Sequence, residues 1–512
     1  MVFFQWVAVF EIINIAIQYL ISSHSFGICP RLPTKHLRFM KISRRTLWIS
    51  LILLCVMKCF YFFTFIVERN PETFSGFIVK GLALKGGDSG TYYDPLQNLF
   101  DNGDYWGICR MPGLAPVYLP LRVLFSHEQT QVVIIFIQLA GDILASFLCA
   151  LLCFRLFKSI TAYWTAIVFT AFSAFVLVRA NYLLSDSFCN TSLILCAWFL
   201  HEWKHTKLVK HLLFSGVFLA WAIFLRQISI TIIPSFVLLV MFFSERKLIR
   251  MIQWSFVFLI PLMLSISAWT IRNKVVFDRN IVLVAPINEC MRQLTPEFLA
   301  MRKLLITMGQ DAQPWAKGGA LHWIMDREET YSCPIAERHL SGTVTRDSME
   351  VMKVDYWRLQ STDSIDVSQQ NEFVTRCERF ESVYKKDHWF LHQVVNRIDF
   401  LYQFLFPPRL DDIPTKSFQE ANIIVKMIKL GNYLLLLIVH ALMLLSLLLQ
   451  LWRKEFEILL WSSVGFVPIF ILAYLGYIEQ RYLATSHYFF ILAIGYLAAF
   501  AARKFKKEPA ID

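Results

Sequence analysis

The chain has 512 residues, of which 56% are hydrophobic and 17% are charged, and its formal net charge is +12. Soluble proteins carry roughly 25% charged residues, so this composition excludes an ordinary soluble domain. The basic residues lie in short runs between apolar stretches, a distribution that indicates membrane topology and argues against a nucleic-acid partner. The sequence therefore predicts an all-α polytopic membrane protein whose partners include membrane lipids.

The N-terminal segment 1–45 has two interpretations. The stretch 2–21 is apolar enough to span a membrane, apart from Glu11, and would add a helix with an outside N-terminus. Alternatively, Met40 is the natural start, because a basic run and a clean span follow it. A signal peptide is not expected, because the segment lacks a charged n-region and a small-residue cleavage site.

Ten further stretches are apolar over the length of about 20 residues that a span requires, giving about 10–11 transmembrane helices. They lie near 46–67, 130–154, 162–179, 187–203, 211–225, 228–244, 252–271, 430–451, 456–476 and 483–502. If these spans alternate, six basic clusters fall on one side, which the positive-inside rule makes cytoplasmic. The clusters are Lys41/Arg44/Arg45, Arg155/Lys158, Lys204/Lys207/Lys210, Arg246/Lys247/Arg250, Arg453/Lys454 and Arg503/Lys504/Lys506/Lys507.

This topology divides the chain after its N-terminal segment into three parts. The transmembrane core 46–272 includes the first outer loop, 68–129. An extracytoplasmic, mostly helical soluble domain follows at 273–429, with charged helical stretches and the size of a small independent domain. The C-terminal part, 430–512, holds the last transmembrane helices and a basic cytoplasmic tail. Asp142 lies inside a span, where we expect a buried interhelical hydrogen bond.

The first outer loop carries Asp88, Tyr92 and Tyr93, and Arg110 opens an Arg-Met-Pro-Gly run further along it. A carboxylate can accept a proton from an acceptor hydroxyl, and an arginine can hold a phosphate. Lys85 is a second cation of this loop. The pattern indicates transfer from a lipid-phosphate donor, although aspartate is also a turn residue and tyrosines also form interfacial belts.

Other charged residues fall on the same outer side. Asp186 heads an apolar helix, where it either caps the helix or binds an acceptor or a divalent cation. Arg226, Arg272 and Arg481 adjoin spans directly, so they either reach lipid headgroups or recognise phosphate. If a metal binds, Asp88 and Asp186 supply hard oxygen ligands that suit Mg²⁺ or Mn²⁺. The sequence assigns no other cofactor.

The order of these motifs along the chain resembles one family. They are Gly-Asp-x-x-x-Tyr-Tyr at 87–93, Arg-x-Pro-Gly at 110–113, Leu-Ser-Asp-Ser at 184–187, Phe-Leu-Arg at 224–226, Ala-Trp-Thr-Ile-Arg-Asn at 268–273 and Glu-Gln-Arg-Tyr at 479–482. This order, with its shared face, resembles the polyprenyl-phosphate-sugar-dependent glycosyltransferases of the GT-C class. The similar branch is that of protein O-mannosyltransferases and lipid A aminoarabinose transferases. The resemblance covers residues 46 to about 280 and 430 to 502.

The resemblance implies an inverting membrane enzyme that takes a hexose or pentose from a polyprenyl phosphate. Under the resemblance, Asp88 would lie close to the reacting centre and Arg110 would bind the donor phosphate. From their residue type and their place on the same face, we add Asp186 as a second candidate catalytic carboxylate and Lys85, Arg226, Arg272 and Arg481 as further candidate phosphate ligands. Sugar or acceptor contacts would come from Tyr92, Tyr93, Glu479 and Tyr482. The acceptor would be a lipid, a glycan or a protein.

Two other functions are compatible with a polytopic membrane protein. One is a transporter or flippase of lipid-linked glycans, but its usual internal repeat and midplane charges are not found. The other is a glycan polymerase that uses a diphosphate-linked donor. The short loops favour a bacterial inner membrane, with the active site facing the periplasm or exterior. The endoplasmic reticulum is the alternative location.

Overall fold

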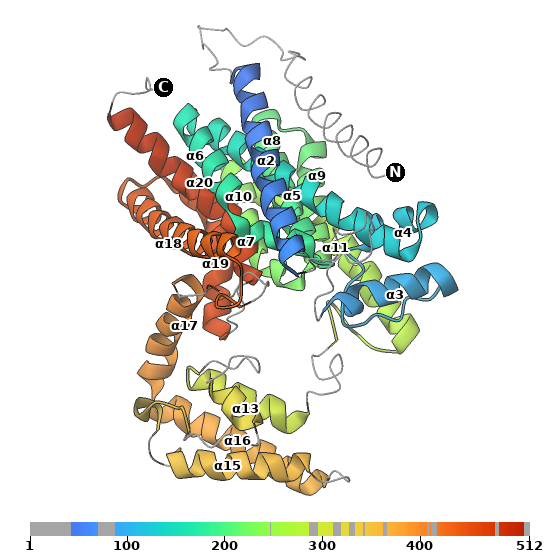
Figure 1. The fold of residues 1–512 in the computed structure, drawn as a ribbon, viewed down its shortest axis with the longest axis vertical. Coiled ribbons are helices and arrows are strands. Elements are labelled where there is room, and N and C mark those ends of the chain that lie inside the picture. Colours follow the sequence, from blue (N-terminus) through green and yellow to red (C-terminus); the bar gives the residue numbers. More distant parts are fainter. Residues whose placement is uncertain are drawn as a thin grey trace. The chain divides into compact units, whose positions relative to one another are not determined.

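The computed structural model describes most of the chain, and in that part every regular element is helical. The described residues are 42–69, 88–245, 247–285, 295–310, 319–326, 333–340, 342, 344–361, 366–406, 410, 417–476 and 481–505. They contain no β-strand. The predicted all-α class is therefore confirmed, and the ribbon in Figure 1 shows its helices in chain order.

The chain separates into two compact units. Unit 1 comprises Met1–Leu283, Pro408–Pro468 and Arg481–Asp512, and unit 2 comprises Val284–Pro407 and Ile469–Gln480. The helices that begin in unit 1 are α2 (Arg44–Arg69), α3 (Ser89–Asn102), α4 (Ala115–Leu124), α5 (His127–Phe157), α6 (Ile160–Phe172), α7 (Ala174–Leu177), η2 (Val178–Asn181), α8 (Asp186–Thr206), α9 (Val209–Leu225), η3 (Gln227–Ile232), α10 (Ile233–Phe243), α11 (Leu248–Phe277), α18 (Ile423–Trp452), α19 (Phe456–Leu475) and α20 (Arg481–Lys504).

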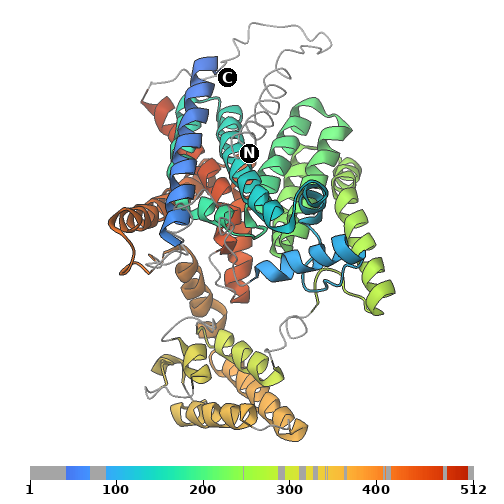
Figure 2. The same cartoon turned by 45° about the vertical axis from the view of Figure 1, so that its right-hand side comes forward.

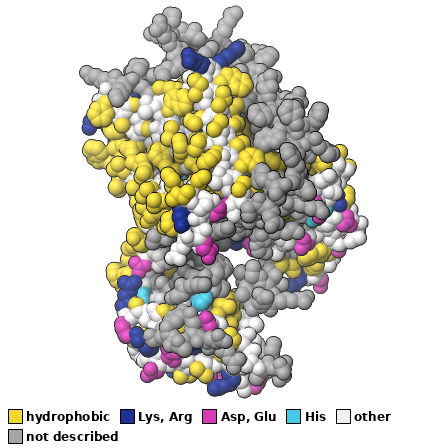
Figure 3. All heavy atoms as spheres, viewed as in Figure 1, with side chains coloured by type: hydrophobic (Ala, Val, Ile, Leu, Met, Phe, Trp, Pro, Cys, Tyr) yellow, Lys and Arg dark blue, Asp and Glu magenta, His cyan; other side chains and the backbone are white. Residues whose placement is uncertain are grey.

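Six helices in the described part are long and apolar enough to cross a membrane: α2, α5, α11, α18, α19 and α20. A bent pair, Ile160–Phe172 with Ala174–Asn181, is a further candidate, and Val209–Leu225 and Gln227–Phe243 are shorter apolar helices. The expected span 187–203 lies within α8, whose side chains are mostly buried, so α8 packs inside the bundle. All ten expected stretches are thus helical, and the chain is a polytopic integral membrane protein. Figure 3 shows a broad hydrophobic surface on one face, around α18.

The bent pair α6 and α7 breaks at Ser173, and a neighbouring helix compensates for the break. The pair bends by 50° there. The backbone N–H of Phe175 donates a 2.9 Å hydrogen bond to the side-chain oxygen of Asn432 in α18. An unpaired backbone group is costly away from water, so this bond allows the helix to break inside the bundle.

A buried polar cluster joins three spans of unit 1. Lys58 of α2 forms an ion pair with Asp142 of α5, with 2.7 Å between Nζ and Oδ2. The hydroxyl of Tyr488 in α20 donates to the other Asp142 oxygen at 2.6 Å. The interhelical hydrogen bond expected for Asp142 is confirmed. Since an intramembrane charge needs a partner, the cluster fixes α2, α5 and α20 relative to one another.

Described residues from several of the basic clusters lie together at one end of the bundle of unit 1. Arg155 forms an ion pair with Glu202, and Lys204 forms one with Glu457. Arg503, near the end of α20, donates to the carbonyl of Phe157 at 3.3 Å. The 24 residues of α20 rise about 36 Å at 1.5 Å per residue. Arg481 at its start is therefore separated from this basic end by the thickness of a bilayer.

Unit 2 is a helical domain with its own apolar core. Its helices are α13 (Pro296–Thr307), α14 (Ala320–Met325), η4 (Glu337–His339), α15 (Arg346–Gln360), α16 (Val367–Asp387), the π-helix η5 (Leu391–Val395) and α17 (Asn396–Leu405). Met301, Leu304, Trp323, Met349 and Phe373 are buried in one cluster. The last turns of α19, beyond Pro468, also belong to this unit.

Candidate functional site

Asp88 begins α3, but its side chain does not cap the helix. It occupies the N-cap position with no side-chain capping hydrogen bond. Its backbone carbonyl instead accepts the N–H of Thr91 at 3.1 Å and the Thr91 hydroxyl at 2.7 Å. These backbone contacts hold the first turn of α3 and leave the carboxylate of Asp88 for other partners.

Two arginines from distant parts of the chain bind that carboxylate. Arg110, in the loop between α3 and α4, lies 3.3 Å from Asp88 Oδ2, and Arg481, the first residue of α20, donates to the same oxygen. Burial would raise the pKa of Asp88, but the charges of Arg481 and Arg110, with a smaller contribution from Arg226, hold that pKa below its ordinary value. Asp88 is therefore a stable carboxylate.

A second ion pair joins α8 to the end of α9. Arg226 Nη1 lies 2.5 Å from Asp186 Oδ2, and the two side chains are 4% and 1% exposed. Asp186 is the first residue of α8, where the helix dipole favours a negative charge. Arg226 lies close enough to act on the carboxyl of Asp88. We therefore treat Asp88, Arg110, Asp186, Arg226 and Arg481 as one Arg–Asp cluster.

Two of the predicted aromatic residues flank this cluster. The guanidinium of Arg110 lies 4.9 Å from the ring centre of Tyr92, and that of Arg226 lies 5.5 Å from Tyr482. Tyr93 points elsewhere, because its ring packs edge-on against Tyr118 at 5.7 Å and is 2% exposed. Tyr92 and Tyr482 are thus the aromatic neighbours that the structure brings to the charges.

Arg272 makes different contacts from those expected. Its guanidinium lies over the rings of Tyr105, Trp269 and Phe277 at 5.3, 5.1 and 4.8 Å, and donates to the carbonyl of Gly107 at 3.3 Å. No described contact joins it to the two aspartates of the cluster. Arg272 therefore supports the loop that carries Arg110, rather than adding a charge to the cluster.

Two predicted site residues, Lys85 and Glu479, lie outside the residues that the structure describes. Their predicted roles in phosphate and sugar binding stay predictions. The metal site is also untested. In the described part of the chain, no three His, Cys, Asp or Glu side chains are grouped to hold a metal ion. There, Asp88 and Asp186 each bind arginine.

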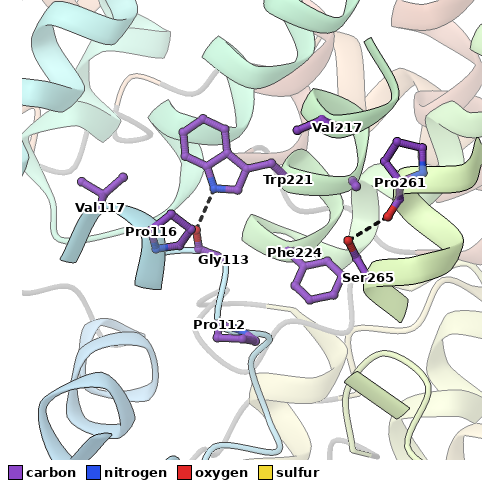
Figure 4. Close-up of a pocket in the computed structure, with 10 residues that line it drawn as sticks. Pro112, Gly113, Pro116, Val117, Val217, Trp221, Phe224, Pro261 and Ser265 are labelled. Carbon is purple, nitrogen blue, oxygen red and sulfur yellow. Dashed lines mark hydrogen bonds between the residues drawn. The ribbon is translucent and has the colours of Figure 1, made fainter. Parts of the chain in front are cut away.

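Gly113 brings the two arginine loops together, a role that the sequence did not reveal. A Cβ at Gly113 would lie 2.4 Å from the backbone carbonyl of Phe224. The indole N–H of Trp221 donates to the Gly113 carbonyl at 2.8 Å, as Figure 4 shows. This close approach places the loop that follows Arg110 directly against the end of α9, just before Arg226.

An apolar pocket of about 460 Å³ lies beside this contact (Figure 4). It opens between the start of α4, the end of α9 and the middle of α11. Its lining residues are Pro112, Gly113, Pro116, Val117, Val217, Ala220, Trp221, Phe224, Pro261 and Ser265. The lining carries no charged side chain, so the pocket suits an apolar ligand next to the arginine loops.

Comparisons with known proteins give one distant likeness. No protein-family model matches the sequence, and no characterised protein matches it by sequence. Among solved structures, the chain matches the crystal structure of ArnT from Cupriavidus metallidurans in the apo state. The match has 14% identity and a TM-score of 0.34, and it covers 89% of this chain and 78% of that one. At this distance, the residues of the site itself must carry the functional argument.

Proposed function

We propose that this protein is an inverting membrane glycosyltransferase. It would move a sugar from a polyprenyl-phosphate donor to a lipid, glycan or protein acceptor. The observation that carries the proposal is the carboxylate of Asp88, held between Arg110 and Arg481 beside a pocket with an apolar lining. A proton acceptor, phosphate ligands and an apolar pocket for the lipid chain are the three parts that this reaction needs.

The charge of the cluster suits the phosphate of the donor. Three arginines and two aspartates give a net charge of 3 − 2 = +1. A sugar phosphodiester carries one negative charge, and its phosphate gains a second as the bond to the sugar breaks. Arg110 and Arg481, with Arg226 behind them, would offset this growing charge, and such stabilisation is strongest where water is excluded.

Asp88 would receive the proton of the acceptor. The acceptor oxygen or nitrogen attacks the anomeric carbon, the bond from that carbon to the phosphate oxygen breaks, and the acceptor proton passes to Asp88. The polyprenyl phosphate leaves with the electron pair of the broken bond. When Arg110 and Arg481 turn to the donor phosphate, the pKa of Asp88 rises, because these charges lower it in the free protein. Donor binding thereby makes Asp88 a better base.

The apolar pocket and the two aromatic rings complete the proposal. The pocket would take the first isoprene units of the donor, because its lining continues from Pro112 and Gly113, just after Arg110. Tyr92 and Tyr482 would contact the sugar, and Asp186 would hold Arg226 in place through their ion pair. Under the positive-inside rule, the basic end of the bundle is cytoplasmic. The cluster would then face the periplasm or exterior of a bacterial inner membrane.

The test is transfer of labelled sugar from a mixed pool of polyprenyl-phosphate sugars in membranes. We expect the wild-type protein to transfer label, and Asp88→Asn and Arg110→Ala to lose it at matched expression and folding. Arg250→Ala is the matched control, because that arginine is 52% exposed at the other end of the bundle. Equal transfer by all variants would refute these roles. Movement of intact donor across the bilayer without transfer would favour the flippase.

A further inference from the structure

Unit 2 exposes four large apolar side chains around its π-helix. Trp389 and Phe390 precede η5 and are 61% and 63% exposed, and Ile398 and Tyr402 of α17 are 60% and 61% exposed. Ile398 and Tyr402 are four residues apart, so they lie on the same side of α17. Trp389 and Phe390 lie at the other end of η5, and we call these four exposed residues together the aromatic face. In water, such a surface is unfavourable, because it leaves apolar area uncovered.

The other side of α17 is already packed, so the aromatic face does not belong to the core of unit 2. Phe400 and Phe404 are 0% and 1% exposed. A surface helix normally places polar side chains opposite its buried side. In α17 the exposed side instead carries Ile398 and Tyr402, which indicates that a further apolar environment covers it.

The position of α17 beside the end of a membrane span identifies that environment. The guanidinium of Arg397 in α17 lies 5.2 Å from the ring centre of Tyr474, in the last turn of α19. A Cβ at Gly476, the next residue after α19, would lie 3.3 Å from the ring of Phe400. Since α19 is apolar enough to cross a membrane and ends at Leu475, α17 lies where that span leaves the bilayer.

We infer that the aromatic face is a lipid-binding surface, inserted into the membrane interface around the end of α19. Trp, Tyr and Phe are suited to this region, where apolar rings meet the headgroups. Lys386 is exposed just before the aromatic face and would contact lipid phosphates. Unit 2 is therefore held at the bilayer in two ways: by the helix α19, whose last turns belong to it, and by direct contact of the aromatic face with lipid.

Photo-cross-linking of the full-length protein in vesicles of phosphatidylcholine and phosphatidylglycerol tests this inference. Ile398→benzoylphenylalanine and Tyr402→benzoylphenylalanine place the reactive group on the aromatic face. Val354→benzoylphenylalanine is the control, because Val354 is 58% exposed on α15, which both ribbon views show away from α17 within unit 2 (Figures 1 and 2). Adducts are identified by mass spectrometry after the variants are matched to wild type by size-exclusion profile.

We expect lipid adducts at positions 398 and 402 and none at position 354. If no lipid adduct forms at either position 398 or position 402, the inference is overturned. Cross-links to another segment of this chain or to a second copy would also overturn it, because protein would then cover the face. Equal lipid adducts at all three positions would show non-specific labelling and would likewise contradict a defined surface. The result does not depend on any transfer activity.

Discussion

Asp88 is bound by Arg481, which lies 393 positions further along the chain at the start of α20. Arg110, on the same loop as Asp88, binds the same carboxylate oxygen. A single carboxylate with two guanidinium partners leaves one positive charge uncompensated, and this charge would attract the donor phosphate to which both arginines turn. At the scale of single residues, this exchange would prepare Asp88 to accept the proton of the acceptor.

The first prediction concerns the pH dependence of transfer. The two arginines lower the pKa of Asp88 below its ordinary value of 3.8, so the acidic limb of kcat/KM should lie below that pH. Arg481→Gln removes the larger of the two charges that lower the pKa of Asp88. The acidic limb should then move to higher pH, because burial raises this pKa and less positive charge opposes it. The measurement is kcat/KM between about pH 3 and pH 7, which reports groups of the free enzyme. An unmoved limb would show that another group titrates.

The second prediction concerns the buried pair of Asp186 and Arg226. Removing one partner leaves an uncompensated buried charge, which costs about 3–5 kcal/mol. Asp186→Leu should therefore lower the thermal unfolding temperature in detergent strongly. The double variant Asp186→Leu/Arg226→Met should recover most of this loss, because two apolar side chains need no partner. If the double variant is as unstable as the single one, the pair is not the source of the effect.

The candidate site was partly predictable from the sequence at this scale. Asp88 and Arg110 were singled out together because they share the first outer loop, and the structure places them in contact. Their roles in transfer stay predictions. Arg272 was grouped with them because it follows an apolar span, but three aromatic rings surround it. Which arginine approaches a given carboxylate depends on tertiary packing, and residue type alone does not determine it.

At the scale of elements, Gly113 sets the distance between the α3–α4 loop and the end of α9. The third prediction is that Gly113→Ala destabilises the protein by about 1–3 kcal/mol, as overpacking does. Its Cβ would lie 2.4 Å from the Phe224 carbonyl, and the backbone must move. Transfer should fall too, because Arg110 and Arg226 lie next to this contact. The measurements are thermal unfolding in detergent and the transfer assay.

Gly431→Ala is the matched control for that prediction. Gly431 lies within α18, and a Cβ there would meet no atom within 4 Å. Alanine favours a helix over glycine by about 0.5–1 kcal/mol, so this variant should be neutral or slightly more stable. Equal stability of Gly113→Ala and wild type would contradict the close contact.

Helix positions were readable from the sequence, but helix lengths were less so. Hydropathy alone located all ten apolar stretches, because backbone hydrogen bonds must be satisfied within each segment in lipid. The break at Ser173 was missed, because it depends on Asn432 from a distant helix. The turn that carries Arg226, by contrast, was expected between the stretches 211–225 and 228–244, and α9 ends at Leu225 just before it. A pattern of apolar residues does not reveal a break such as the one at Ser173 inside a hydrophobic run.

At the scale of the whole molecule, the composition predicted the fold class. The basic runs of the sequence also predicted that one end of the unit 1 bundle would be rich in Lys and Arg. The basic residues Arg155, Lys204 and Arg503 gather at one end through contacts with neighbouring helices. Arg481 and the Arg–Asp cluster lie at the opposite end of α20. The boundary of unit 2 inside α19 was not readable, because the helix passes Pro468 without a change in apolar character.

The last prediction concerns the orientation of unit 1 in the membrane. An epitope inserted at Gly103, the exposed residue that follows α3, should be reached by antibody in right-side-out vesicles. An epitope inserted at Lys454, between α18 and α19, should be reached only in inside-out vesicles, because basic loops stay cytoplasmic. Antibody access to both epitopes in the same intact vesicles would place the site and the basic end on one side. The reversed pattern would place the Arg–Asp cluster on the cytoplasmic side. A donor whose sugar lies on the outer side of the bilayer could not then reach the cluster.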